Sequence, residues 1–257
     1  MASNRSQSLI KFAESLRLYN PNNNSFDGSS NNINIHNIQN QSQKIKEIGT
    51  DQVGNNDNNN NNNNSRRSIS NRAAVLVCLF EDQQGQLRVI LTKRASTLSL
   101  HSGEVALPGG KVEEDDADDI ETALREAEEE IGLDRSLVDV VTVLESLPAR
   151  NRITVIPVVG ILWDRNAFNP VINTAEVEAI FDAPLEMFLK DENRREKEIK
   201  YMGDEYLIHF FDHETENGKY MIWALTAGIL IKTASIVYQR PPDFQVRMPR
   251  FWNRSRQ

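Results

Sequence analysis

An asparagine-rich tract divides the chain in two and decides where a folded domain can lie. Residues 1–70 contain "NNINIHNIQNQSQ" and "NNDNNNNNNNS", which cannot bury enough apolar surface to offset the entropy lost on ordering. We therefore expect a disordered N-terminal region at residues 1–70, a domain at 71–240 and a C-terminal tail at 241–257. In the first region only "SLIKFAESLRLYN" has apolar residues at helical spacing, so this short helix either docks on the domain or stays loose.

From Arg72 onward the chain contains short apolar runs that are typical of strands. "AAVLVCLF" and "LRVILTK" flank the polar "EDQQGQ" and predict a hairpin, as do "EYLIHFF" and "YMIW" around Asn217 and Gly218. Further strands are expected at "LVDVVTVLE" and "ITVIPVVGILW", and helices from about Asp118 to Ile131, at "PLEMFLK" and at "ALTAGILIKTASIVY". Strands and a few helices without regular alternation predict an α/β fold with a mixed sheet sandwiched between helices.

Composition narrows the classes of function that this domain can have. The net charge of -8 argues against a nucleic-acid-binding surface. No apolar run is long enough to span a membrane, and "MIWALTAGILI" is expected in the core. The single cysteine, Cys78, lies within an apolar run, which favours a buried structural thiol in a reducing compartment. We expect a cytoplasmic protein; a mitochondrial one is the alternative, because the N-terminal helix has few acids and contains serine.

Acidic side chains crowd the wrong end of the helix that ends near Ile131. A helix C-terminus carries partial negative charge, so carboxylates there are unfavourable by about 0.3–1 kcal/mol each. On a helical wheel the apolar residues share one face: Ile120, Leu124, Ala127 and Ile131. Three glutamates converge on the opposite side at spacings of three and four: Glu126, Glu129 and Glu130. They form either a solvated face or a site for a divalent cation, which would neutralise their mutual repulsion.

The stretch before this helix, "LPGGKVEEDD", favours the cation site. Gly109 and Gly110 allow positive φ angles and let the backbone approach a ligand or ion closely. A plain turn between a strand and a helix is the simpler interpretation of these glycines. A glycine loop and a helix with converging acids are each common alone, but a loop that leads directly into such a helix is less common. The combination resembles a metal–phosphate site.

The same residues resemble a known family motif. Gly110, five residues, Asp116, eight residues and then "REAEEEIGL" are similar to the Nudix box, GX5EX7REUXEEXGU, where U is aliphatic. Asp116 stands for the usual glutamate, and one extra residue precedes Arg125; both departures also occur in the coenzyme A diphosphatase branch. Upstream, "LTKRASTLSLHSGEVALPGG" resembles the second signature of that branch, with Ser99 in place of an arginine and Leu107 in place of a phenylalanine. The resemblance runs from about Arg72 to Gln239 and is strongest to plant members.

The resemblance implies a Nudix fold and a metal-dependent Nudix diphosphohydrolase. Its substrate would be the diphosphate of coenzyme A, with acyl-coenzyme A as an open variant, and its products 4′-phosphopantetheine and adenosine 3′,5′-bisphosphate. It implies Mg²⁺ or Mn²⁺ as the cofactor. The metal positions would be Glu126, Glu130, Glu129 and the Gly110 carbonyl, and the catalytic positions Glu129, as a general base, and Arg125, which orients a glutamate. The substrate-binding positions would be Arg94, Gly109, Gly110 and Lys111.

Several alternatives stay open at this point. The Nudix box alone does not distinguish a hydrolase of NADH or ADP-ribose from one of coenzyme A. A catalytically silent module that binds a nucleotide is a further alternative, against which stands the presence of all three helix glutamates. We expect a small-molecule substrate, no nucleic-acid partner and no membrane association. The sequence leaves open whether the protein is a homodimer.

Overall fold

The computed structural model describes residues 6–19, 71–149, 153–201 and 203–249 of the 257-residue chain. The asparagine-rich tract, and the expected disorder of residues 20–70, lie outside the described residues, as does the tail beyond residue 249. Within the described residues, no helix is both long and apolar enough to cross a membrane.

The main sheet is mixed, as the sequence predicts. Its path is β3-β2-β1-β7-β5, and the bounds are Val105–Ala106 for β3, Leu87–Arg94 for β2, Arg72–Glu81 for β1, Thr154–Leu162 for β7 and Val138–Val143 for β5. β1 and β7 are parallel, and the other pairs are antiparallel. Off this path, β4 (Gly109–Lys111) pairs with β1, β6 (Leu147–Pro148) with β7 and β8 (Val177–Pro184) with β2. The first predicted hairpin, β1–β2, is confirmed, with Leu79 opposite Val89.

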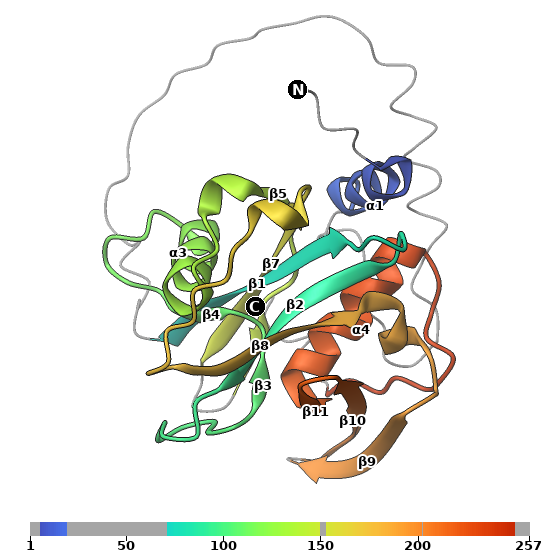
Figure 1. Cartoon of the computed structure of the whole chain (residues 1–257). Coiled ribbons are helices and arrows are strands. Elements are labelled where there is room, and N and C mark those ends of the chain that lie inside the picture. The colour runs from blue at the N-terminus through green and yellow to red at the C-terminus, as the bar shows by residue number, and fades with distance from the viewer. Residues whose placement is uncertain (1–5, 20–70, 150–152, 202, 250–257) are drawn as a thin grey trace, which may run out of the picture.

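Helices cover both faces of this sheet (Figure 1). α3 (Asp119–Ile131) packs on one face, against β1, β4 and β7. α4 (Ala224–Tyr238) lies on the other, against the short helix η6 (Leu185–Leu189) and the N-terminal helix α1 (Gln7–Arg17). Two further single turns are η3 (Arg135–Leu137) and η5 (Arg165–Ala167). The predicted helices at α3, η6 and α4 are thereby confirmed, and the mixed α/β sandwich is the observed fold.

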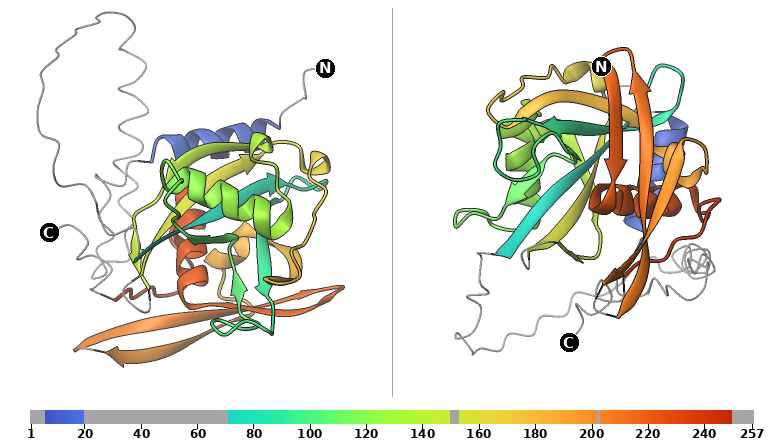
Figure 2. Two further views of the ribbon diagram at one scale, coloured as in Figure 1. Left: turned by 90° about the vertical axis from the view of Figure 1, so that its left-hand side faces the viewer. Right: turned by 90° about the horizontal axis from the view of Figure 1, so that it is seen from below.

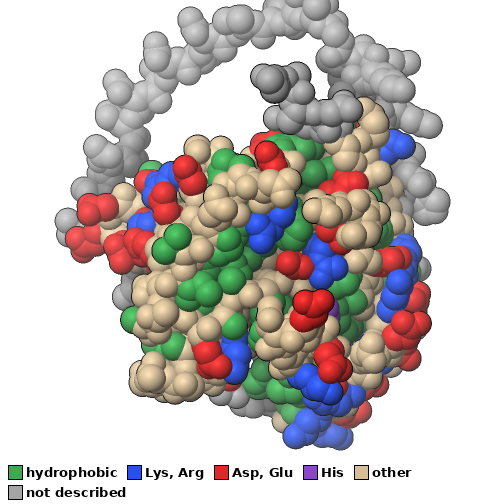
Figure 3. Space-filling model, in the orientation of Figure 1, with side chains coloured by type: hydrophobic (Ala, Val, Ile, Leu, Met, Phe, Trp, Pro, Cys, Tyr) green, Lys and Arg blue, Asp and Glu red, His purple; other side chains and the backbone are tan. Residues whose placement is uncertain are grey.

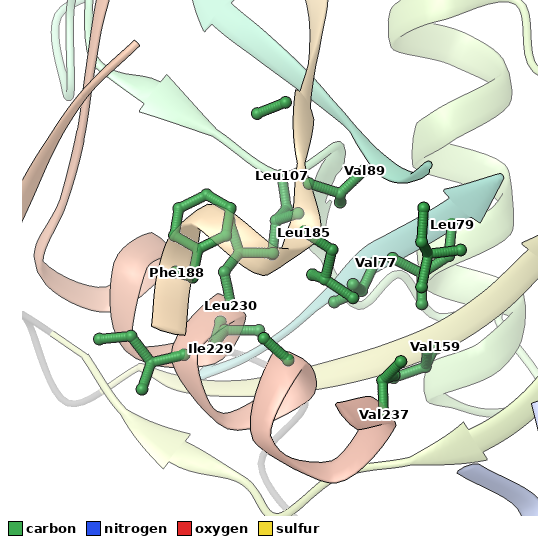
Figure 4. Close-up of a cluster of buried hydrophobic side chains, with 14 of the residues drawn as sticks. Val77, Leu79, Val89, Leu107, Val159, Leu185, Phe188, Ile229, Leu230 and Val237 are labelled. Carbon is green, nitrogen blue, oxygen red and sulfur yellow. The ribbon is translucent and has the colours of Figure 1, made fainter. Parts of the chain in front are cut away.

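Alternation along β1 assigns its side chains to the two faces. Leu76 and Cys78 face α3, whereas Val77 and Leu79 face α4. Figure 4 shows the core on the α4 side, where Val77 and Leu79 meet Leu230 and Val237. Cys78 is fully buried, and burial raises the pKa of its thiol to about 12. The expected structural role of Cys78 is confirmed, because a thiol with so high a pKa is a poor nucleophile.

A second, three-stranded sheet has the order β11-β10-β9 and extends along one side of the molecule (Figure 2). Its strands are β9 (Arg194–Tyr201), β10 (Asp204–Thr215) and β11 (Gly218–Trp223). β10 and β11 form the second predicted hairpin. Residues 241–249 pack beside this sheet, where the Leu207 N–H donates to the Arg247 carbonyl.

The N-terminal helix docks on the domain, which the sequence left open. The Ser6 side chain caps α1 by accepting from the N–H groups of Ser8 and Leu9. The apolar face of the helix is buried: Leu9, Ala13 and Leu16, followed by Tyr19. Arg17 pairs with Asp139 of β5 at 2.7 Å, and the Tyr19 hydroxyl donates to Glu145 at 2.6 Å. Residues 7–19 therefore belong to the same core as the domain.

Candidate functional site

The glycines of β4 allow α3 to lie close to the sheet. A Cβ atom on Gly109, whose φ is 155°, would lie 2.3 Å from the Ala74 carbonyl oxygen and 2.6 Å from the Val75 Cα. A Cβ atom on Gly110 would lie 2.3 Å from a carboxylate oxygen of Glu126. Only glycine fits at position 109, because a side chain there would collide with backbone, whereas a side chain at position 110 would displace the Glu126 carboxylate. The glycine loop therefore brings main chain directly against the acids of α3.

α3 has a defined beginning and end, and this fixes which residues face β4. The Asp118 side chain caps the helix by accepting from the Glu121 N–H at 2.9 Å. At the other end Gly132 adopts the left-handed conformation with φ 69°. Small residues, Ala123 and Ala127, are fully buried between these ends. They pack against the β1 side chains Leu76 and Cys78 in the core beneath the helix.

Glu130 is buried, which corrects its placement on the exposed face of the helix. Its side chain is 2% exposed, its Oε2 accepts from the Gly109 N–H at 3.2 Å, and its Oε1 lies 3.5 Å from Arg94 Nη1. Ala127 and Ile131 of the expected apolar face are fully buried, and Ile120 and Leu124 are half-buried against the same core. The buried side of the helix also includes Glu130, because the close glycine strand accepts a carboxylate at that position.

Burial also changes the protonation of the helix glutamates. It raises the pKa of Glu130 to about 7, against the opposing effects of Arg94 and the Gly109 N–H, and repulsion from Glu126 and Glu176 adds to the rise. The pKa of Glu126 is raised for the same main reason, burial, and the charge of Arg125 opposes this rise. The side chain of Glu129 is more exposed than these two, at 55%, and contacts Arg125.

Arg125 holds the cluster together. Its Nε and Nη2 donate to the two carboxylate oxygens of Asp116 at 2.8 and 2.9 Å, and its Nη1 lies 3.2 Å from Glu126 and 3.1 Å from Glu129. Nη2 also donates to the Lys111 carbonyl at 3.0 Å. This single guanidinium ties together the glycine strand, the loop before the helix and two helix glutamates. The contacts fit the expected orienting role of Arg125.

Asp116 fixes the orientation of the Arg125 side chain. Its side chain is 3% exposed, and besides Arg125 it accepts from the Glu113 N–H and the Thr122 hydroxyl, both at 2.8 Å. The hydrogen bonds from Arg125, followed by those from Glu113 and Thr122, hold the pKa of Asp116 well below its usual range. The other acids of the preceding loop are exposed: Glu113, Glu114, Asp115 and Asp118. Figure 3 shows acidic side chains gathered at this edge of the molecule. The loop therefore contributes one buried acid that orients Arg125.

The remaining predicted residues lie at the edge of this cluster. Arg94, at the end of β2, pairs with a helix acid, Glu130, and its buried Nε has no hydrogen-bond partner among the residues that the structure describes. The Lys111 side chain is exposed, and this residue contacts Arg125 through its carbonyl oxygen. Sequence reasoning missed Glu176, which follows β7 and precedes β8 and raises the pKa of both Glu126 and Glu130. A single acid in a connecting segment gives no motif, so no sequence signal identifies it.

The residues fit a hard divalent cation, although they do not already form a closed metal site. Among the described residues, no three His, Cys, Asp or Glu side chains are gathered as a ready metal site. Arg125 and Arg94 instead contact the glutamate oxygens. The donor set consists of carboxylates and a glycine carbonyl, the oxygen ligands that Mg²⁺ and Mn²⁺ prefer. The Arg94 Nε, which has no partner among the described residues, would fit an anionic ligand beside the cation.

Comparison with known proteins identifies the same region. The family model for the NUDIX domain matches residues 70–203. "Nudix hydrolase 15, mitochondrial" of Arabidopsis thaliana is 67% identical over 180 residues, and "Nudix hydrolase 22, chloroplastic" of the same plant is 66% identical over 178 residues. These matches cover 70% and 69% of this chain, but only 63% and 59% of the two relatives. A peroxisomal coenzyme A diphosphatase of Mus musculus is 37% identical over 69% of this chain and 75% of its own length.

Proposed function

We propose, because the chain belongs to the NUDIX domain family, that it hydrolyses the diphosphate of coenzyme A in the presence of Mg²⁺ or Mn²⁺. The products would be 4′-phosphopantetheine and adenosine 3′,5′-bisphosphate. One observation supports a hydrolytic site above the others: Arg125 holds Glu126 and Glu129 beside the glycine strand against which Glu130 is buried. The family resemblance predicted from the sequence is confirmed, whereas the substrate remains a proposal.

Each residue of the cluster has a part in this proposal. Glu126, Glu130 and Glu129 would hold the divalent cation, with the Gly110 carbonyl as a further ligand. When bound, the cation would neutralise charge on the diphosphate and lower the pKa of the attacking water. Arg125 orients Glu126 and Glu129, and Asp116 in turn fixes Arg125. Glu129 is the most exposed of the three glutamates, so its carboxylate is best placed to accept a proton from water as the general base.

Two features support coenzyme A over other diphosphates. The stretch from Leu91 to Gly110 resembles the second signature of the coenzyme A branch, and it runs from the end of β2, where Arg94 lies, through β3 into β4. The mouse relative is named a coenzyme A diphosphatase. The Arabidopsis relatives are named only as Nudix hydrolases, so NADH and ADP-ribose remain the alternative substrates. A silent binding module is disfavoured because Glu126, Glu129 and Glu130 are all present in the cluster.

The names of the two Arabidopsis relatives bear on localisation. They are described as mitochondrial and chloroplastic, which favours the organellar alternative over the cytoplasmic location expected from the sequence. We therefore propose an organelle as the site of action. Fractionation of cells that express the tagged chain would test this, and recovery of the enzyme in the cytosol alone would contradict it.

The substrate is tested by identifying products. The purified chain would be incubated with coenzyme A, NADH or ADP-ribose and with Mg²⁺ or Mn²⁺, and the products analysed by mass spectrometry. We expect 4′-phosphopantetheine and adenosine 3′,5′-bisphosphate from coenzyme A at the highest kcat/KM. The Glu126→Gln variant is the control for a contaminating hydrolase. Faster cleavage of NADH or ADP-ribose would replace the proposed substrate, and no cleavage of any of the three would favour the silent module.

A further inference from the structure

The second sheet has one face in the core and one face turned outward. Side chains alternate between the two faces along a strand, and in β10 Leu207, His209 and Phe211 are buried. The ring of Phe211 packs against that of Phe188, with centroids 5.1 Å apart, and α4 packs against β10 and β11 on this side. The even-numbered residues of β10 therefore point away from the core.

The outward face carries a continuous row of apolar side chains, which we call the apolar stripe. Its members come from all three strands: Ile199, Tyr206, Ile208, Phe210, Met221 and Trp223. None of the six is buried, and Met221 is 40% exposed. Phe210 lies opposite Trp223, and their rings stack with centroids 5.6 Å apart. A continuous apolar surface left open to water is typical of an interaction site.

The free edge of this sheet is unsuited to pairing with another strand. β9 forms that edge and is charged along most of its length: Arg194, Arg195, Glu196, Lys197, Glu198 and Lys200. Charged side chains on an edge strand oppose the addition of a further strand. Association is therefore expected through the outward face rather than through the edge.

The charges around the apolar stripe favour a second copy of the chain as the partner. The outward face has three cations and three acids: Arg195, Lys197 and Lys219, with Asp204, Asp212 and Glu214. Two of the cations are neutralised on the face itself, by ion pairs of 3.1 Å to Asp212 and 3.2 Å to Glu214. The chain as a whole has a net charge of -8, so two copies repel each other least when neutral faces meet. A strongly charged partner would gain no attraction from this face.

The arrangement of the strands fits the same conclusion. Two sheets pack face to face about 10 Å apart, with their strands aligned within about 30°. A two-fold axis parallel to β10 would place β9 of one copy over β11 of the other. Arg195, whose guanidinium lies 5.3 Å from the Phe210 ring centroid, would then also face the ring of Trp223 of the second copy. An axis perpendicular to the strands would instead place β9 over β9, with cations on both.

We propose that the protein forms a homodimer in which the apolar stripe packs on the apolar stripe of a second copy, with the two-fold axis parallel to β10. The contact is isologous and closes at two copies. This inference goes beyond the proposed function, because the carboxylate cluster on α3 takes no part in it. It settles the oligomeric state that the sequence leaves open.

Sedimentation equilibrium of the full-length chain over a wide concentration range tests the dimer. We expect a mass of twice the 29.2 kDa of one chain. Ile208→Lys would place like charges beside each other at the two-fold axis and should weaken dimerisation by about 100-fold or more. Gln83→Lys makes the same change in charge at the exposed turn between β1 and β2, and should leave the dimer intact. A monomer at every concentration of the unaltered chain would overturn the proposal.

Thermal melting shows whether each variant is folded. Met221→Lys provides a second substitution in the apolar stripe, at its most exposed member, and replaces Ile208→Lys if that variant does not fold. A dimer that neither substitution weakens would lie on another surface, and the proposal would fail.

Chemical cross-linking tests how the two copies are arranged. The native thiol of Cys78 is fully buried, so a cysteine introduced at position 208 would be the reactive thiol. A short bismaleimide should link two copies of Ile208→Cys, because β10 faces β10 across the axis, and should link no copies of Gln83→Cys. A dimer that is not linked through position 208 would overturn the arrangement. A monomer whose thiol at position 208 is shielded from maleimide would show that another part of the same chain covers the apolar stripe, which also contradicts the proposal.

Discussion

The two faces of the main sheet differ in the side chains that the covering helices bury against them. On one face α4 and α1 bury aliphatic side chains with few charges, and Leu16, Leu79 and Leu230 are fully buried there. On the other, α3 buries the carboxylate of Glu130 and half-buries that of Glu126 against glycines. The first arrangement stabilises the fold through apolar burial. The second reduces stability without metal, because buried carboxylates repel one another, and it provides the ligands that the proposed reaction needs.

Removing a charge from the α3 face should have the largest effect of all. We expect Glu126→Gln or Glu130→Gln to lower turnover by more than about 100-fold, since even residues that only support a metal ligand contribute about 10–100-fold. The metal-free Tm should stay level or rise, because a repelling charge is lost. Steady-state kinetics and thermal melting in EDTA measure the two quantities. A variant with near-normal activity would overturn the assignment of that glutamate to the metal.

The α4 face should respond in the opposite way. Leu16 of α1 is fully buried, so Leu16→Ala should lower the free energy of unfolding by about 2–5 kcal/mol, as measured by urea denaturation. Activity of the folded enzyme should change little, because α1 packs on the face away from the carboxylates. Lys11→Ala, on the exposed side of the same helix, is the control. Equal destabilisation by both substitutions would show that α1 does not dock through its apolar face.

The docking of α1 adds an expected loss of stability when residues 1–64 are deleted. From composition alone, deletion of residues 1–64 is expected to leave the catalytic rate within about a few-fold, because a polar segment can hardly form a substrate wall. We retain this expectation for the rate and add that the truncated chain should be less stable. It loses the buried side chains of Leu9, Leu16 and Tyr19. A truncated chain as stable as the complete one would contradict this.

Much of the fold could be predicted because periodicity and composition act locally. The α3 helix was expected from about Asp118 to Ile131 and has its cap at Asp118 and its last residue at Ile131. Both hairpins follow from strand runs around polar turns. Neither β8 nor β9 was expected from the sequence, and in β9, "RREKEIKY", the alternation is masked by charge on nearly every residue. Such charge is typical of an edge strand that has a partner on one side only, here β10.

The sequence motif predicts which residues belong to the site, but not how they are arranged in space. The box identifies Arg125 and the helix glutamates as a set, but the burial of Glu130 depends on how closely α3 approaches the Gly109–Gly110 strand. Glu176 depends on tertiary hydrogen bonds to the end of α3 and to Ala95. Long-range contacts of this kind leave no periodic pattern in the chain, so they cannot be read from local spacing.

The stability contributed by the α3 face should depend on pH, whereas that of the α4 face should not. The pKa of Glu130 is about 7 in the folded state, against an ordinary value of 4.5. Below pH 4.5 this carboxyl is protonated in both states and costs nothing. As the pH rises to about 7, the unfolded chain ionises first, so the metal-free protein should lose about 3 kcal/mol of stability from this group.

Urea denaturation in EDTA across this pH range measures the loss of stability. Groups other than Glu130 titrate as well, so the informative quantity is the difference between the original chain and Glu130→Gln. That difference should grow from pH 4.5 to about 7 and then level off. Leu16→Ala, on the other face, should lower stability by the same amount at every pH. A constant difference for Glu130→Gln would show that Glu130 ionises as freely as in the unfolded chain.

The smallest expected effect concerns Arg94, where two interpretations compete. As a substrate-binding residue it would grip the 3′-phosphate that coenzyme A has and 3′-dephospho-coenzyme A lacks. The structure instead pairs it with a helix acid, Glu130, 3.5 Å away. Because Arg94 lowers the pKa of Glu130, we expect it to act through that carboxylate, and so to affect both substrates alike.

Arg94→Ala should therefore reduce kcat/KM for coenzyme A and for 3′-dephospho-coenzyme A by the same factor, about tenfold. It should also move the acidic limb of the pH–rate profile upwards, because Glu130 would lose the positive charge that favours its ionised form. Lys93→Ala is the matched control, since Lys93 is the adjacent cation on β2 and pairs with Glu178. A loss confined to coenzyme A, with an unshifted pH profile, would instead make Arg94 the residue that binds the 3′-phosphate.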